Sequence, residues 1–151
     1  MSNKQPLILL PGLLCDEALW RHQIDNLSDL VDMTVTDLTQ DDTVVEMAHR
    51  VLATAPDQFA LAGLSMGGYL AQEVMRQAPD RVTKLALLDT SFYADTPEQL
   101  ERRRGLIELS QKGAFKGVTS RLLPLLIHES RLKDEDLTET IFKMAESLGK
   151  D

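Results

Sequence analysis

Short apolar runs recur along the first ninety residues of the chain. Residues 6–10, 59–64 and 82–88 are almost continuously apolar, whereas in residues 31–38 apolar positions alternate with polar ones. Continuous runs of this length are typical of strands buried in a parallel sheet, and alternation is typical of a half-buried strand. The pattern predicts about four parallel strands.

Between these runs, apolar residues recur at spacings of three and four, which predicts amphipathic helices. One helix is expected over residues 16–30, with Asp16 as its N-cap, and a second over residues 44–55, where Pro56 ends it. A third is expected over residues 66–78. Strands that alternate with helices in this way predict an α/β fold, in which helices connect parallel strands.

After the fourth run the strand signal ends, and three helical segments follow. The first begins at Pro97, because Thr96–Gln99 has the sequence of a capping box with proline at the first helical position. The second covers residues 114–127, where Pro124 is expected to kink or split it, and the third covers residues 134–148. We therefore expect two parts, residues 1–94 and residues 95–151.

Acidic residues outnumber basic ones by 24 to 16, which gives the chain of 151 residues a net charge of −8. An acidic chain is a poor match for the phosphate backbone of nucleic acid, so we expect no nucleic-acid partner. The one basic run, residues 102–104, is more simply explained as a solvated helix face.

The sequence predicts neither a membrane segment nor an oxidising compartment. No run approaches the roughly 18 apolar residues of a membrane-spanning helix, and Pro11 and Gly12 interrupt the apolar stretch near the N-terminus. Cys15 is the only cysteine, so it has no partner for a disulfide within the chain. We expect a cytoplasmic protein with no membrane partner.

The pattern Gly63-x-Ser65-x-Gly67 lies where the third strand runs into the third helix. A serine in a sharp strand-to-helix turn brings the backbone two residues before it against the backbone two residues after it, and only glycine leaves room there. The Ser65 hydroxyl would then stand at the carboxyl edge of the sheet as a nucleophile. The alternative is that the glycines only permit close packing and that Ser65 caps the helix.

Acyl transfer also needs hydrogen-bond donors for the oxyanion that develops in the transition state. One candidate is the N–H of Met66, directly after the serine, and the other is the N–H of Leu13, in the loop after the first strand. Gly12 would let that loop turn toward the serine. An ordinary turn at Pro11 and Gly12 is the alternative explanation.

With these elements in order, the chain resembles the α/β-hydrolase superfamily and, within it, the cap-bearing esterases and enol-lactone hydrolases. The resemblance implies a partial α/β-hydrolase core in residues 1–94 and a helical cap in residues 95–151. It implies a serine hydrolase that acts on a carboxylic ester, a lactone or a related small acyl substrate. The sequence contains no metal-ligand cluster or nucleotide motif, so we expect no metal and no cofactor.

In this superfamily the catalytic acid and histidine follow two further strands, which the sequence lacks, so the resemblance implies a hydrolase truncated after its cap. His22, His49 and His128 all fall on predicted helices or at a helix end, and each is more simply explained as a surface or packing residue. Of the three, His128 is the candidate substitute for the base, because the resemblance implies that the cap faces the pocket. Asp89, after the fourth strand, is a candidate acid, but without a histidine to orient it is more simply explained as a turn residue.

Two other functions stay open at this stage. The chain could be a non-catalytic binding or assembly module, since the fourth strand would present an unpaired edge, residues 82–88, through which a homodimer could form. The same serine could also carry out acyl transfer or perhydrolysis in place of hydrolysis.

Overall fold

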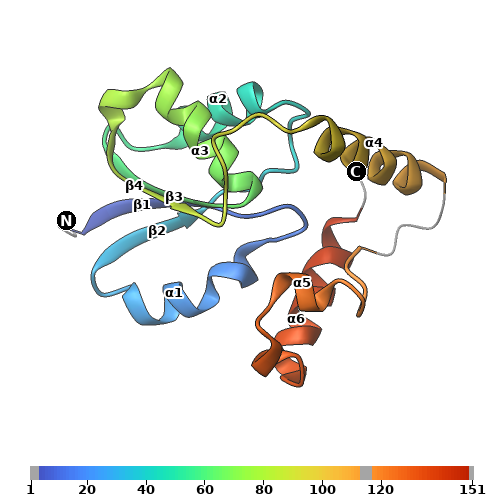
Figure 1. Cartoon of the computed structure of the whole chain (residues 1–151). Helices are drawn as coiled ribbons and strands as arrows, with labels where there is room; N and C mark the ends of the chain where they lie inside the picture. Colours follow the sequence, from blue (N-terminus) through green and yellow to red (C-terminus); the bar gives the residue numbers. More distant parts are fainter. Residues whose placement is uncertain (1–3, 113–116, 150–151) are drawn as a thin grey trace. The chain divides into compact units, whose positions relative to one another are not determined.

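Four parallel strands form one sheet in the first part of the chain (Figure 1). The computed structural model describes residues 4–112 and 117–149. The strands are β1 (Gln5–Leu10), β2 (Val31–Val35), β3 (Phe59–Leu64) and β4 (Val82–Leu88), in the order β2-β1-β3-β4. The predicted parallel sheet is confirmed.

The second strand is shorter than the sequence pattern predicts, because it ends at Val35 and not at residue 38. The Asp37 carboxylate accepts hydrogen bonds from the backbone N–H of Thr39, at 2.9 Å, and from its hydroxyl, at 2.7 Å. This local turn competes with strand pairing and starts the loop to the next helix.

Three helices connect the strands, with bounds α1 (Arg21–Leu27), α2 (Val44–Thr54) and α3 (Met66–Gln77). The helix predicted over residues 16–30 is only partly confirmed: a 3₁₀ turn, η1 (Glu17–Trp20), precedes α1, and α1 ends at Leu27. Asp16 is the N-cap of that turn and accepts from the N–H of Ala18 at 2.8 Å. A second 3₁₀ turn, η2 (Pro79–Arg81), follows α3.

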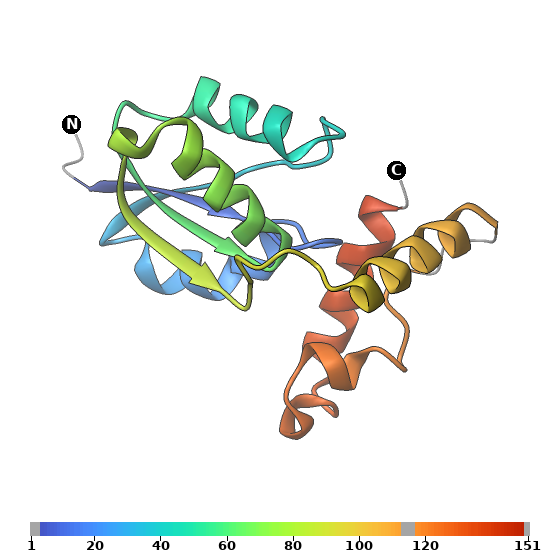
Figure 2. The ribbon, with the colours of Figure 1, turned by 45° about the horizontal axis from the view of Figure 1, so that its top comes forward.

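Helices cover both faces of the sheet (Figures 1 and 2). On one face, β1 and β3 pack against α2 and α3, and the buried side chains there include Leu10, Phe59 and Leu70. On the other face, Leu9 and Ala62 pack against Trp20, which η1 supplies. The centre of the sheet is therefore buried on both sides.

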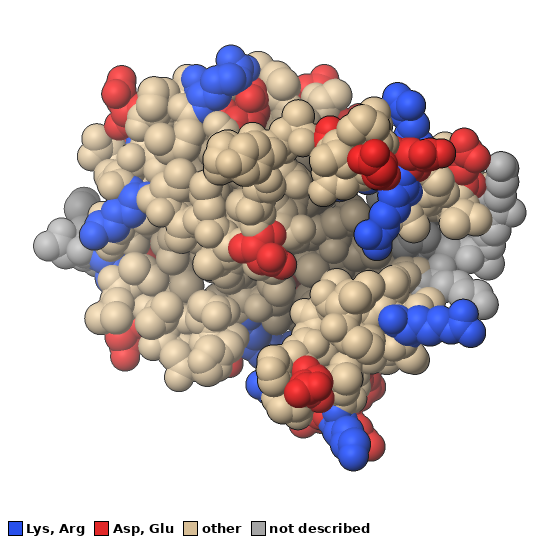
Figure 3. All heavy atoms as spheres, viewed as in Figure 1, with Lys and Arg blue, Asp and Glu red and all other residues tan. Residues whose placement is uncertain are grey.

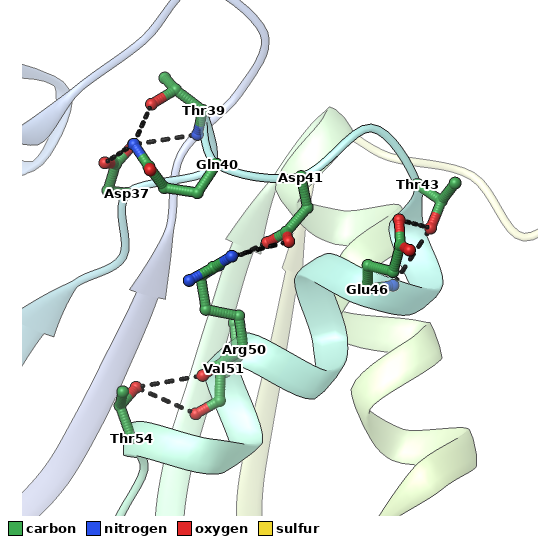
Figure 4. A network of polar contacts seen from close by, with 9 residues as sticks. All are labelled: Asp37, Thr39, Gln40, Asp41, Thr43, Glu46, Arg50, Val51 and Thr54. Atoms are coloured by element: carbon green, nitrogen blue, oxygen red, sulfur yellow. Dashed lines mark hydrogen bonds and ion pairs between the residues drawn. The ribbon is translucent and has the colours of Figure 1, made fainter.

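The loop from β2 to α2 and the start of α2 are held by polar contacts (Figure 4). Arg50 forms a bidentate ion pair with Asp41, at 2.5 and 2.8 Å. Thr43 caps α2 by accepting from the N–H of Glu46 at 3.2 Å, and its hydroxyl donates to the Glu46 carboxylate at 2.8 Å. These contacts fix the entry of the chain into α2.

The fourth strand differs from the buried strand that its apolar sequence predicts. β4 lies at the edge of the sheet, and its residues from Thr83 to Leu88 are all exposed. Leu85, Leu87 and Leu88 are about two-fifths exposed, at 41%, 43% and 39%. In the described part of the chain β4 pairs with β3 alone, so its outer edge carries free backbone groups.

The chain divides into two compact units, Met1–Phe92 and Tyr93–Asp151, and the second unit is helical. Its elements are α4 (Pro97–Lys112), α5 (Leu123–Leu126), a 3₁₀ turn η3 (Glu129–Arg131) and α6 (Glu135–Leu148). The predicted capping box is confirmed: Gln99 accepts from the N–H of Thr96 at 2.8 Å, and Thr96 accepts from the N–H of Gln99 at 3.3 Å.

The long helix predicted over residues 114–127 is wrong where the structure describes it. Only Leu123–Leu126 is helical there, and residues 114–116 lie outside the described residues. Pro124 falls in the first turn of α5, where its missing N–H removes no helical hydrogen bond. A proline at this place begins a helix, so it does not kink one that is already formed.

Charged side chains of both signs lie on the face of the molecule that Figure 3 shows. On the face that Figure 3 shows, Lys and Arg side chains lie at separate places and are interspersed with Asp and Glu. This face therefore carries no patch of a single charge. None of the helices in the described ranges is both long and apolar enough to span a membrane.

Candidate active site

Ser65 occupies a strained turn between β3 and α3. Its φ of 52° and ψ of −110° lie in a region that non-glycine residues rarely adopt. A Cβ atom on Gly63 would collide with the carbonyl oxygen of Gly67, and a Cβ atom on Gly67 would collide with the carbonyl oxygen of Leu10. The turn is therefore so tight that side chains at positions 63 and 67 would not fit.

The Ser65 side chain is exposed and unengaged. Ser65 occupies the N-cap position of α3, but its hydroxyl makes no capping hydrogen bond, and it has no other hydrogen-bond partner among the described residues. This geometry contradicts the alternative in which Ser65 serves to cap the helix. The hydroxyl is free to meet a ligand at the amino end of α3, where the helix dipole is positive.

The loop after β1 lies directly beside this turn. A Cβ atom on Gly12 would lie 3.5 Å from the carbonyl oxygen of Leu64 and 3.7 Å from the Cβ atom of Ser65. The loop is a hydrogen-bonded turn, in which the N–H of Cys15 donates to the carbonyl of Gly12 at 3.1 Å. This turn runs from Gly12 to Cys15, and it places Leu13, the residue after Gly12, in the neighbourhood of Ser65.

Two backbone donors near Ser65 have no partner. The N–H groups of Leu13 and Met66 donate to no other group in the described ranges 4–112 and 117–149. Met66 is the first residue of α3, so its N–H has no acceptor within the helix. Both groups are available to hydrogen-bond an oxygen of a bound molecule.

Backbone strain gathers at one edge of the sheet. Among the described residues, three non-glycine residues have positive φ: Leu14 at 60°, Ser65 at 52° and Asp89 at 42°. They follow β1, β3 and β4, which are parallel, so all three lie at the carboxyl edge. Such strain commonly accompanies functional sites. The sequence carries no signal for Leu14, because leucine is not a residue that favours this conformation.

Within the described residues of the first unit, neither histidine forms a hydrogen bond with the Ser65 hydroxyl. His22 lies on α1 beside Asn26, whose amide donates to the carbonyl of His22 at 2.8 Å, and His49 lies on α2. His128 belongs to the second unit, where its Nδ1 accepts from the N–H of Ser130 at 3.3 Å and caps η3. All three occupy a helix or a helix end, as the sequence predicts.

Cys15 is a further reactive group in the loop beside Ser65. Burial, followed by the charge of Asp16, raises the pKa of the Cys15 thiol, while the hydrogen bond with Gly12 acts in the opposite direction. The thiol therefore stays protonated near neutral pH and is a poor nucleophile. Within the described residues, histidine, cysteine and carboxylate side chains form no group of three that could hold a metal ion.

The sequence is similar to curated proteins that are named as methyl ester esterases. No protein-family model matches the sequence. It is 30% identical, over 153 aligned positions, to the pimeloyl-[acyl-carrier protein] methyl ester esterase of Vibrio parahaemolyticus, covering 95% of this chain and 53% of that protein. The esterase of the same name from Vibrio campbellii is 30% identical over 101 positions, which cover 60% of this chain and 40% of that protein. The chain thus spans about half the length of these curated relatives, or less.

Solved structures match the fold over nearly the whole chain. A thermophilic esterase from Thermogutta terrifontis aligns with a TM-score of 0.79 and 27% identity, covering 99% of this chain and 60% of that one. The enol-lactonase from Burkholderia xenovorans aligns with a TM-score of 0.80 and 19% identity, covering 95% of this chain and 59% of that one. Because these matches run through the four-stranded parallel sheet and the strand-to-helix turn at its carboxyl edge, this chain belongs to the α/β-hydrolase superfamily.

Proposed function

We propose that this chain carries the nucleophile of a serine hydrolase, with Ser65 as the catalytic residue. The observation that supports this most directly is the free Ser65 hydroxyl in a strained turn, beside two unpaired backbone N–H groups. Strain that no capping hydrogen bond offsets is costly, on the order of 1–3 kcal/mol. Such a conformation is more simply explained by a reacting group than by a structural one.

In the proposed reaction the Ser65 Oγ attacks the carbonyl carbon of an ester, and its proton passes to a base. The carbonyl oxygen becomes an oxyanion, to which the N–H groups of Leu13 and Met66 donate. When the tetrahedral intermediate collapses, the alcohol leaves with a proton and an acyl-serine remains. Attack by water then releases the carboxylic acid and restores the serine.

We propose that the substrate is a carboxylic ester, a lactone or a related small acyl compound. The curated relatives are named as methyl ester esterases, and the similar structures include an esterase, an enol-lactonase and a thioesterase domain. These names share attack on an acyl carbonyl group. Acyl transfer to an acceptor other than water would use the same serine.

Fluorophosphonate labelling of the 151-residue chain tests the nucleophile. We expect slow covalent labelling that is absent in Ser65→Ala and unchanged in Ser28→Ala, a control that removes an exposed hydroxyl at the end of α1. Peptide mapping would place the label on Ser65. A folded chain that takes up label elsewhere, or none on Ser65 even after long incubation, would contradict Ser65 as the nucleophile.

The source of the base is a separate question, because within the described residues of the first unit neither histidine forms a hydrogen bond with the Ser65 hydroxyl. We propose that the histidine and the acid of the triad are not among the residues around Ser65, so the chain alone reacts slowly. His128→Gln and Asp89→Asn test the two candidates within the chain. Labelling that falls at least tenfold in His128→Gln would assign the base to the second unit and would contradict this proposal.

A second candidate function is assembly through the edge of β4. The observation that favours it is the exposure of Leu85, Leu87 and Leu88 along a strand whose outer edge has no partner in the described residues. An exposed apolar edge strand is a template for pairing with another chain. Two copies paired through residues 82–88 would form a continuous sheet.

Light scattering coupled to size-exclusion chromatography tests this assembly. We expect the mass of a dimer, and a monomer in Leu87→Lys, because a charge on the edge strand opposes pairing. The control is Leu30→Lys, which places the same charge at a residue that is 68% exposed and lies outside β4. A monomer of the unchanged protein at high concentration would exclude the dimer.

A further inference from the structure

The strained conformation of Ser65 needs a source of stability, and the segment that follows β4 supplies one. The N–H of Ser65 donates to the carbonyl of Leu88 at 2.9 Å. The hydroxyl of Thr90 donates to the carbonyl of Ser65, also at 2.9 Å. Ser65 is therefore held through its N–H and through its carbonyl oxygen by residues that lie two positions apart.

The Thr90 side chain is fixed by packing as well as by this hydrogen bond. A Cβ atom on Gly68 would lie 2.5 Å from the Cβ, Cγ2 and Oγ1 atoms of Thr90, so the threonine rests directly on the backbone of α3. Only a glycine at position 68 lets it come so close. The hydroxyl of Thr90 thus has little freedom to turn away from Ser65.

The chain on either side of Thr90 is also constrained. Asp89 adopts a φ of 42°, which turns the chain at the end of β4. Gln72, on α3, donates through its side-chain amide to the carbonyl of Ser91 at 3.0 Å and to that of Gly68 at 3.3 Å. Thr90 therefore lies between a sharp turn and a contact that fastens the next residue to α3.

We propose that Thr90 is a positioning residue, whose hydroxyl holds the backbone of Ser65 in its strained conformation and so keeps the Ser65 side chain presented at the carboxyl edge of the sheet. The other acceptor contacts of the Ser65 carbonyl come from the N–H groups of Gly68, at 2.9 Å, and Tyr69, at 3.3 Å, which belong to the helix itself. Thr90 adds the contact that comes from outside α3. The effect on reactivity rests on the proposed function, but the effect on the Ser65 backbone does not.

The experiment compares three variants of the full chain. Thr90→Val removes the hydroxyl and keeps the shape, Thr90→Ser keeps the hydroxyl, and Thr83→Val makes the same change on β4 at a hydroxyl whose hydrogen-bond partner is the Gln5 side chain. The first readout is the set of ¹³Cα, ¹³Cβ and ¹⁵N chemical shifts of Ser65, which follow its φ and ψ. The second is the rate at which a fluorophosphonate labels Ser65.

We expect the Ser65 shifts to move in Thr90→Val and to stay near their original values in Thr90→Ser and Thr83→Val. The labelling rate should fall about tenfold in Thr90→Val, as loss of one well-placed hydrogen bond predicts, and should recover in Thr90→Ser. A merely structural role would lower the melting temperature of Thr90→Val without moving the Ser65 shifts relative to its neighbours. If Thr90→Val does not fold, Thr90→Ala gives the same comparison without the bulk of the second methyl group.

The two readouts separate this proposal from the proposed function. If the unchanged protein takes up no label but the Ser65 shifts move in Thr90→Val alone, Thr90 positions Ser65 and the nucleophile assignment fails. If the unchanged protein is labelled, and Thr90→Val keeps both the Ser65 shifts and the labelling rate, the positioning role is overturned.

Discussion

At the scale of single residues, glycine is required in this chain where backbone meets backbone. Gly63 and Gly67 lie so close to other main-chain atoms that a methyl group would not fit, and Gly67 would also bring a Cβ atom to 2.7 Å from the carbonyl oxygen of Pro11. Gly105 is different, because nothing lies within 4 Å of a Cβ atom built on it. Close packing therefore requires glycine at positions 63 and 67 of the first unit, whereas no neighbouring atom requires it at position 105 of the second unit.

This contrast predicts opposite effects for the same substitution. Gly67→Ala should lower the free energy of unfolding by about 1–3 kcal/mol, since the added methyl group forces the start of α3 away from β1. Gly105→Ala, in the middle of α4, should raise the stability of that helix by about 0.5–1 kcal/mol. Both changes in stability can be measured by urea titration. Trp20 fluorescence follows the unfolding of Gly67→Ala, and far-UV circular dichroism follows that of Gly105→Ala. Equal effects of the two substitutions would contradict the packing argument.

At the scale of elements, a group of side chains ties α3 to α2. The Glu73 carboxylate accepts from Arg76 at 2.6 and 2.8 Å and from the amide of Gln77 at 2.8 Å. The same Gln77 amide donates to the carbonyl of Val45, on α2, at 3.3 Å. The hydrogen bonds from Arg76 first, and then from Gln77, lower the pKa of Glu73 from 4.5 to about 2.

A lowered pKa predicts a dependence of stability on pH with a definite sign. The unfolded chain binds a proton at Glu73 more readily than the folded chain does, so this contribution is present above about pH 4.5 and is lost as the pH falls toward 2. The difference in urea midpoint between the unchanged protein and Glu73→Gln should therefore shrink over that range. Glu101→Gln, on α4, is the control. A difference that stays constant with pH would show that Glu73 does not titrate in this way.

At the scale of the whole molecule, the two units bury unequal cores. Of the buried apolar residues in the described part of the chain, thirteen lie in the first unit and three, Leu123, Met144 and Ala145, lie in the second. Burial of apolar side chains is the main favourable contribution to stability. The role of the second unit as a cap remains a prediction, whereas its small core is a property of the structure.

The unequal cores predict that the two units unfold at different urea concentrations. Trp20 is the only tryptophan and is 5% exposed in the first unit, so its fluorescence follows that unit alone. Far-UV circular dichroism follows the helices of both. We expect dichroism to begin its change at a lower urea concentration than fluorescence, because the helices of the second unit lose their structure first. Coincident curves would mean that the chain unfolds as one cooperative unit.

The four strands, most of the helices and their order along the chain could be predicted from the sequence. The spacing of apolar residues identified four strands, and the pattern from Gly63 to Gly67 located the strand-to-helix turn. The capping residues Asp16 and Thr96 marked the positions where two helical segments begin. These features depend on residues that are near one another along the chain, so a local pattern is enough to encode them. Where a local turn or a proline competed, as at Asp37 and Pro124, the predicted bounds were wrong.

The surroundings of Ser65 and the exposure of β4 could not be predicted from the sequence, because they depend on contacts between distant segments. The hydrogen bond from Thr90 joins residues 25 positions apart, and the approach of Gly12 to Ser65 depends on the order in which the strands pair. The apolar sequence of β4 predicts burial, yet its place at the edge leaves it exposed. Contacts between distant segments are set by the folded sheet as a whole, and no short stretch of sequence carries them.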